Sequence, residues 1–298
     1  MHFNFIKNTI LLFVLILLSC RNNSNSQTPD LKNTAPILLG AQQTERYLPI
    51  LKNKNIGIVA NQTSVIFNPE GYTHLVDSLL SLNINVKKVF APEHGFRGTA
   101  DAGEYVKDGV DAGSGIPIVS LYGANKIPNS AILSDLDVVI FDIQDVGARF
   151  YTFLSTLHYM METCANLGIT VLVLDRPNPN GHYVDGPTLD LKYTSFVGIH
   201  PVPVVHGMTV GEYAQMINGE DWLKEGVKCD LKVISLQNYT HSTSYKLPIN
   251  PSPNLPNSKA INLYPSLCFF EGTNMSMGRG TENQFQVIGS PYLKGDLY

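Results

Sequence analysis

The chain has 298 residues, of which 44 % are hydrophobic and 15 % are charged. This composition is typical of a globular protein with room for one large domain or two smaller ones. The net charge is -4, and Lys and Arg together number only 21. Because recognition of phosphates needs a basic surface, we expect no nucleic-acid partner.

The N-terminus has the pattern of a secretory signal. Lys7 precedes an apolar run from Ile10 to Leu18, and Ser19-Cys20 then leads into a polar tract. This run is too short for a stable transmembrane helix, which needs about 20 residues. The pattern predicts a signal peptide over residues 1–19, lipidation of Cys20 and a flexible tether over residues 20–36. The protein is then expected on a membrane of a bacterial cell envelope, facing the periplasm or at the outer membrane. The alternative is an ordinary signal peptide with an incidental Cys.

Three cysteines remain after Cys20: Cys164, Cys229 and Cys268. Their odd number and the absence of Cys-x-x-Cys spacing argue against a disulfide framework or a zinc ribbon. Each lies in or beside an apolar run, so we expect all three to be small buried hydrophobic residues.

Short apolar runs then alternate with helical patterns along the chain. Strands are expected at 56–60, 86–91, 117–121, 138–141 and 171–174, with helices over 74–82 and 150–167. The later part is less regular, with a helix over 209–218 and a strand over 231–236. Apolar runs of this length with helices between them predict an α/β fold with a parallel sheet.

Several common enzyme signatures are absent. The sequence has no phosphate-binding loop, no Gly-x-Gly-x-x-Gly after the first strand, no Gly-x-Ser-x-Gly, no Ser-x-x-Lys and no His-Glu-x-x-His. We therefore expect no nucleotide cofactor and no metal, since an α/β sheet does not by itself imply either.

Polar clusters follow the predicted strands directly. They begin at Asn61, Pro92, Asp142 and Asp175. Loops at the carboxyl ends of an open parallel sheet form the ligand crevice. Carboxylates, amides and arginines gathered there suit chemistry on a polar sugar.

Glu93 is the best candidate for a catalytic acid. Glycoside hydrolysis needs a carboxylic acid that protonates the leaving oxygen, usually with a second carboxylate as base or nucleophile. Glu93 follows an apolar strand and a proline, and His94 and Arg97 are close to it in the chain. The alternative is a glutamate on a surface loop.

A second carboxylate is expected on the loop after the fourth strand. Asp142 and Gln144 point the same way if that strand continues, and either Asp142 or Asp145 is a candidate. Asp145 could instead cap the helix that carries Arg149 and Tyr151.

Arginines are candidates for binding an anionic group of the substrate, because a guanidinium matches a carboxylate with two parallel hydrogen bonds. Arg149, Arg176 and Arg279 are the three candidates, each with a structural ion pair as the alternative. Asp175 and Arg176 either contact ligand or anchor the loop before Pro177.

Two later features are also polar. His206 could donate to a sugar hydroxyl, or it could be a satisfied structural residue. The run from 270 to 282 contains Glu271, Asn274 and Arg279, and it either lines the crevice or joins two domains.

Six ordered motifs together resemble the NamZ family of exo-β-N-acetylmuramidases, over roughly residues 38 to 298. The motifs are Phe90-Ala-Pro-Glu-His-Gly-Phe-Arg-Gly98, Val139-Ile-Phe-Asp-Ile-Gln-Asp-Val-Gly-Ala-Arg-Phe-Tyr-Thr152, Leu174-Asp-Arg-Pro-Asn-Pro179, His206-Gly-Met-Thr-Val-Gly-Glu212, Pro251-Ser-Pro-Asn254 and Phe270-Glu-Gly-Thr-Asn274 with Gly278-Arg-Gly-Thr281.

The resemblance implies a Rossmann-like catalytic domain over 37–185. Residues 186–298 would hold its remainder and the start of a smaller α+β C-terminal domain. It implies release of terminal N-acetylmuramic acid from peptidoglycan fragments in a cleft between the domains, with Glu93 as the family's proposed catalytic glutamate. Family members continue beyond the Gly-Ser-Pro-Tyr region, so a C-terminal part is expected to be missing. The lactyl carboxylate of N-acetylmuramic acid would give the arginines a ligand.

Two other function classes stay open at this point. A metal-dependent hydrolase would use His94, Asp142 and His206 with Glu93, although the close pair of histidines typical of zinc sites is missing. A non-catalytic lipoprotein that binds muropeptides would show sugar affinity without turnover. The oligomeric state is left open.

Overall fold

The computed structural model describes residues 35–97 and 108–294. The predicted signal peptide, Cys20 and most of the tether lie outside the described residues. Residues from Ile37 onward form one compact unit. Its helices and strands are α2 (Thr44–Leu51), β1 (Ile56–Ala60), β2 (Val65–Asn68), β3 (Gly71–His74), α3 (Leu75–Ser81), β4 (Val86–Ala91), β5 (Gly109–Val110), β6 (Pro117–Ser120), α4 (Ser130–Leu133), β7 (Val138–Asp142), α5 (Phe153–Leu167), β8 (Thr170–Leu174), α6 (Val210–Gly219), β9 (Leu231–Ile234) and α7 (Ser258–Leu267). Short 3-10 turns lie at Gly40–Gln42, Gly123–Asn125, Leu191–Tyr193, Lys224–Gly226 and Cys268–Phe270.

Seven strands form one sheet in the order β5-β6-β4-β1-β7-β8-β9. All neighbours are parallel except β5 and β6, which are antiparallel. The chain moves outward from β1 through β4 and β6, then returns to β7 beside β1 and moves outward the other way. This reversal makes a topological switch point at the carboxyl ends of β1 and β7, as in doubly wound folds. The predicted α/β fold with a parallel sheet is confirmed.

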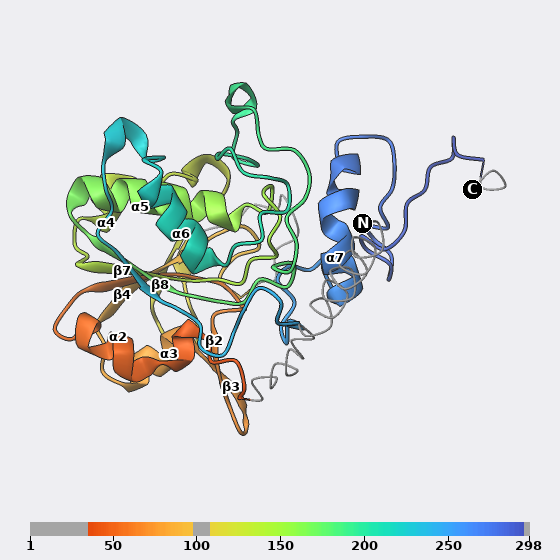
Figure 1. Ribbon diagram of the computed structural model, residues 1–298. Helices are drawn as coiled ribbons and strands as arrows, with labels where there is room; N and C mark the ends of the chain where they lie inside the picture. The colour runs from red at the N-terminus through yellow and green to blue at the C-terminus, as the bar shows by residue number, and fades with distance from the viewer. Residues whose placement is uncertain (1–34, 98–107, 295–298) are drawn as a thin grey trace, which may run out of the picture. The chain divides into compact units, whose positions relative to one another are not determined.

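Side chains of the central strands alternate between two cores. In β7, Val139 and Phe141 join the core under α5 and α6, whereas Val138 and Ile140 join the core over α2 and α3. Figure 1 shows these helix pairs on opposite sides of the sheet. Because both faces are covered, every residue of β1, β7 and β8 is buried. This explains why these strands appear in the sequence as unbroken apolar runs.

The helix predicted over 150–167 begins later, at Phe153. Residues before it form a turn, in which the amide of Tyr151 donates to the carbonyl of Ala148 at 2.9 Å. The helix ends at Gly168, whose φ of 68° lies in the left-handed region that favours glycine. Because residues 150–152 precede the helix, their side chains can line a cavity at the strand ends.

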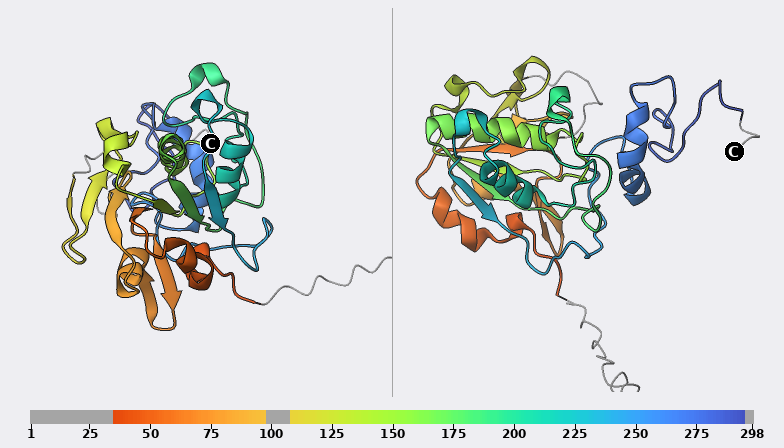
Figure 2. Two further views of the ribbon diagram at one scale, coloured as in Figure 1. Left: turned by 90° about the vertical axis from the view of Figure 1, so that its left-hand side faces the viewer. Right: turned by 45° about the horizontal axis from the view of Figure 1, so that its top comes forward.

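The sequence did not predict α2, the β2–β3 hairpin, β5, α4 or α7. Asn257 caps α7 by accepting from the amide of Ala260. The helix buries Ile261 and Tyr264 in the same core as α5. Figure 1 and the right-hand view of Figure 2 show α7 to one side of the sheet and its two helix layers. Within residues 35–97 and 108–294, no helix has the length and apolarity needed to cross a membrane.

Candidate active site

The topological switch point is filled by side chains of the chain itself. Arg176 pairs with Asp142 through two contacts, Nε to Oδ1 at 2.6 Å and Nη2 to Oδ2 at 2.9 Å. Nη2 also donates to the carbonyl of Val65 at 3.1 Å. Asp142 is fully buried and Arg176 is 3 % exposed. The two side chains therefore form a buried ion pair, and neither lines the main cavity.

Neighbouring polar residues fasten the strand-end loops to one another. The Asn61 Oδ1 atom accepts from the amide and the hydroxyl of Thr63, at 2.9 and 2.6 Å. Gln144 Nε2 donates to the carbonyls of Asp145 and Pro177, each at 2.7 Å. Asn61 and Gln144 were expected at the ligand crevice. Both side chains are instead buried in contacts that hold the loops together.

Asp175 and His206 also lie away from the main cavity. Asp175 accepts from the amide of Gly211 at 2.8 Å and from the hydroxyl of Thr209 at 2.9 Å, so it holds the start of α6. Burial raises the pKa of the Asp175 carboxyl to about 6. His206 is buried, with Nδ1 accepting from the amide of Met208 at 3.2 Å.

Arg149, Arg97 and Asn274 do not line the main cavity either. Arg149 Nη1 donates to the carbonyls of Pro187 and Val202, at 2.8 and 2.6 Å. Arg97 pairs with Asp111 at 2.8 Å. Asn274 is exposed. The backbone carbonyls and the carboxylate that these arginines meet explain why they turn away from the cavity.

Asp145 is a buried carboxyl group with one satisfied oxygen. Its Oδ1 accepts from the amide of Gly147 at 2.7 Å, which makes a local turn and not a cap on α5. Among the described residues, Oδ2 has no hydrogen-bond partner. Burial raises the pKa of the Asp145 carboxyl to about 7. The ionised form is therefore unfavourable in the folded protein.

We expect Asp145→Asn to stabilise the protein at pH 8 and to have little effect near pH 4. The folded state holds the Asp145 proton more tightly than the unfolded state, so the cost of ionising it begins near pH 4 and is complete above about pH 7. The pKa of the buried carboxyl lies about 3 units above its ordinary value, and each unit corresponds to about 1.4 kcal/mol, so the gain at pH 8 should be on the order of 4 kcal/mol. Urea unfolding of both proteins at the two pH values measures it. An equal difference at pH 4 and pH 8 would contradict this account.

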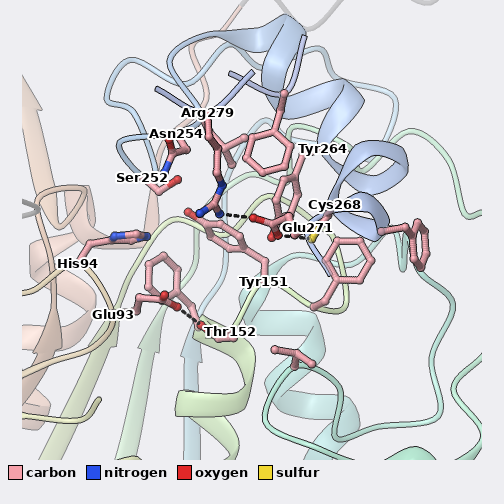
Figure 3. A pocket seen from close by; sticks show the side chains of 16 residues that line it. Glu93, His94, Tyr151, Thr152, Ser252, Asn254, Tyr264, Cys268, Glu271 and Arg279 are labelled. Carbon is pink, nitrogen blue, oxygen red and sulfur yellow. Dashed lines mark hydrogen bonds and ion pairs between the residues drawn. The ribbon is translucent and has the colours of Figure 1, made fainter. Parts of the chain in front are cut away.

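The main cavity has a volume of about 380 Å³ and lies between the strand-end loops and the segment from α7 onward (Figure 3). Its polar lining residues are Glu93, His94, Thr152, Ser252, Asn254, Cys268, Glu271 and Arg279. Its aromatic lining residues are Phe150, Tyr151, Phe153, Tyr264, Phe269 and Phe285. Of the residues expected at the site, it brings together Glu93, His94, Tyr151, Glu271 and Arg279.

A tight turn after β4 presents Glu93 and His94 to the cavity. The amide of Gly95 donates to the carbonyl of Pro92 at 3.0 Å, which places Glu93 and His94 at the two central positions. His94 has a φ of 69°, the left-handed conformation that a type II turn requires at its third residue. The Pro-Glu-His-Gly motif is thus a structural unit that fixes Glu93 at a strand end.

Two hydroxyl groups hold the Glu93 carboxyl group. Tyr122, which follows β6, donates to Oε1 at 2.9 Å, and Thr152, which precedes α5, donates to Oε2 at 3.0 Å. Figure 3 shows the Thr152 contact at the lower wall. Residues from two other loops therefore orient one half-buried acid beside open space.

A chain of aromatic rings forms the wall next to Glu93. Tyr151 contacts Phe153 and Tyr264 edge to face, with centroids 4.9 and 5.7 Å apart. Phe150 contacts Tyr264 at 5.5 Å, and Tyr264 contacts Phe285 at 5.0 Å. These contacts join the turn before α5 to α7 and the loop after it. Such a wall offers flat apolar surface, which suits the faces of a sugar ring.

The opposite wall carries an ion pair between Arg279 and Glu271. Glu271 also accepts a hydrogen bond from the thiol of Cys268 at 2.9 Å. Cys268 is only partly buried and lines the cavity, which corrects the expectation of a buried hydrophobic residue. Cys164 and Cys229 are buried, as expected.

Sequence reasoning missed Ser252, Asn254, Thr152 and Tyr264 as lining residues. Ser252 and Asn254 belong to the Pro-Ser-Pro-Asn motif, and Thr152 ends the long motif after β7. Their motif membership was a usable signal, whereas Tyr264 lies in a helix that no pattern predicted.

The residues named for a metal site do not gather in one place. His94 lines the cavity, Asp142 pairs with Arg176, and His206 is buried elsewhere. Within the part of the chain that the structure describes, no three His, Cys, Asp or Glu residues are grouped so as to hold a metal ion.

Comparison with known proteins gives consistent matches over most of the chain. Residues 56–259 match the family model "Exo-beta-N-acetylmuramidase NamZ, N-terminal", and residues 262–298 match the C-terminal model of the same name. The peptidoglycan beta-N-acetylmuramidase NamZ of Bacillus subtilis (strain 168) is 40 % identical over 253 residues, 83 % of this chain. The chain spans 60 % of the length of that relative.

Two crystal structures of DUF1343 family proteins from Bacteroides fragilis NCTC 9343 are also similar. One is 52 % identical, with a TM-score of 0.79 over 88 % of this chain and 69 % of its own. The other is 30 % identical, with a TM-score of 0.78 over 87 % of this chain and 67 % of its own. With both family models matched in order and a half-buried acid on the wall of the cavity, the chain belongs to the exo-beta-N-acetylmuramidase NamZ family.

Proposed function

We propose that this protein is an exo-acting glycoside hydrolase that releases terminal N-acetylmuramic acid from peptidoglycan fragments, with Glu93 as general acid. One observation carries the proposal: the Glu93 carboxyl group is held by two hydroxyls on the wall of a cavity of about 380 Å³. The 40 % sequence identity with a peptidoglycan beta-N-acetylmuramidase supports the choice of sugar. The volume lies within the range of about 300–1,000 Å³ that small-ligand sites have.

Glu93 would donate its proton to the glycosidic oxygen as the bond from that oxygen to the anomeric carbon breaks. The leaving sugar then departs as a neutral alcohol. A water molecule adds its oxygen to the anomeric carbon and gives up a proton, which balances the one that Glu93 donated. The hydroxyls of Tyr122 and Thr152 orient the acid, and the aromatic wall holds the ring beside it.

Mass spectrometry of the products from a defined disaccharide with N-acetylmuramic acid at its non-reducing end tests this function. We expect two monosaccharides, one of them free N-acetylmuramic acid, and much slower cleavage when N-acetylglucosamine is terminal. Binding of the disaccharide without products would favour the non-catalytic alternative. Loss of activity on treatment with a chelator, restored by a metal, would favour the metal-dependent alternative.

We further propose that Cys20 carries a lipid and holds the enzyme at the cell envelope. The apolar run that ends at Leu18 and the Ser19-Cys20 pair support this proposal. The mature protein should show a mass increment from acyl chains, and Cys20→Ser should abolish it. A mature wild-type protein without acyl mass would rule out the anchor.

A further inference from the structure

The three candidate arginines differ in what their guanidinium groups contact. Arg176 is buried against Asp142, and Arg149 donates to two backbone carbonyls. Arg279 lines the main cavity, and its side chain is 42 % exposed. Among the described residues that line this cavity, it is the only Lys or Arg.

A glycine turn fixes Arg279 in this position. The amide of Thr281 donates to the carbonyl of Gly278 at 3.1 Å, so Arg279 is the second residue of the turn. Gly278 has a φ of 83°, and a Cβ atom there would lie 2.3 Å from the carbonyl oxygen of Asn283. The Arg279 guanidinium lies over the ring of Phe285, 5.6 Å from its centroid. The arginine is therefore positioned by backbone and ring contacts together.

Glu271 engages only part of the Arg279 guanidinium. The ion pair uses Nη2, and no described residue accepts a hydrogen bond from Nε or Nη1. Arginine has five N–H donors, so a second carboxylate can bind while Glu271 remains in place. The thiol of Cys268 holds the other oxygen of Glu271 and so helps to keep the pair oriented.

The charges of the cavity make Arg279 important for an anionic substrate. Glu271 is the second acidic residue of the lining beside the proposed acid Glu93, and its carboxylate would repel a substrate carboxylate if Arg279 were absent. Figure 3 shows Arg279 on the wall facing Glu93. A neutral sugar needs no cation there, whereas a carboxylated sugar would meet uncompensated negative charge without one.

We propose that Arg279, oriented by Glu271, binds the lactyl carboxylate of N-acetylmuramic acid and sets the preference for that sugar over N-acetylglucosamine. This inference rests on the proposed function. The two sugars share the ring and the acetamido group and differ by the lactyl ether. Arg279 is thus a specificity-determining residue, separate from the acid that protonates the leaving group.

The test compares catalytic efficiencies on chromogenic β-N-acetylmuramide and β-N-acetylglucosaminide. Arg279→Ala should lower the muramide-to-glucosaminide ratio on the order of tenfold to a hundredfold, through a higher KM for the muramide. Arg279→Lys keeps the charge and loses the two-pronged geometry, so it should lose part of the ratio. Arg149→Ala, which removes an arginine outside the cavity, should keep the wild-type ratio.

An unchanged ratio in folded Arg279→Ala and Arg279→Lys variants would overturn the inference. A structural role of the Arg279–Glu271 pair would lower both efficiencies together and leave the ratio unchanged. Calorimetric titration with the two free sugars separates the inference from the proposed function. If the wild type turns over neither sugar, the function fails. Preferential binding of N-acetylmuramic acid that Arg279→Ala abolishes would still support the inference, and equal binding would reject it.

Discussion

Replacing Glu93 with Gln is expected to reduce turnover of a muramic-acid-terminated substrate by at least ~100-fold, because general acid catalysis typically contributes that much or more. The amide has the shape of the carboxyl group but cannot deliver a proton to the leaving oxygen. It keeps an oxygen acceptor for Tyr122 or Thr152, so the turn and the cavity should persist. We therefore expect the fall in kcat, with little change in affinity for the disaccharide.

Steady-state kinetics and binding titration on the wild type and Glu93→Gln measure these effects. Glu70→Gln is a matched control, since it makes the same chemical change on the exposed turn between β2 and β3. Thermal unfolding of each variant checks the fold. Turnover near the wild-type rate in folded Glu93→Gln would assign the acid to another group.

Replacing Arg176 with Met is expected to destabilise the protein by about 3–5 kcal/mol, because it leaves the buried Asp142 carboxylate without a partner. The cost arises from the unpaired charge and not from the loss of packing, since Met keeps most of the aliphatic chain. The double variant Asp142→Leu with Arg176→Met removes both charges, so it should be much more stable than Arg176→Met alone.

Urea unfolding of the two single variants and the double variant measures this coupling. Lys192→Met provides a surface comparison, because Lys192 and Asp190 are 64 % and 55 % exposed and their pair should contribute less than about 1 kcal/mol. A double variant less stable than Arg176→Met would contradict this account. It would show that the unpaired Asp142 carboxylate is not the main cause of the lost free energy of unfolding.

The sequence by itself determined the sheet and the position of the candidate acid. The strands predicted at 56–60 and 86–91 are β1 and β4 with the same bounds. Strands covered on both faces must be apolar throughout, and that requirement is local enough to be visible in a short window of sequence. The same logic placed Glu93 at a strand end, where ligands bind in parallel sheets.

Only the tertiary structure decided which polar residues face the cavity. Asp142 ends β7 and Glu93 lies just after β4, yet Asp142 meets Arg176 from the β8 loop and is fully buried. Arg149 and Arg279 look equivalent in the sequence, but only Arg279 lines the cavity. Local sequence carries the burial pattern of a strand, whereas the partner of a charged side chain comes from a distant segment and depends on how the loops pack together.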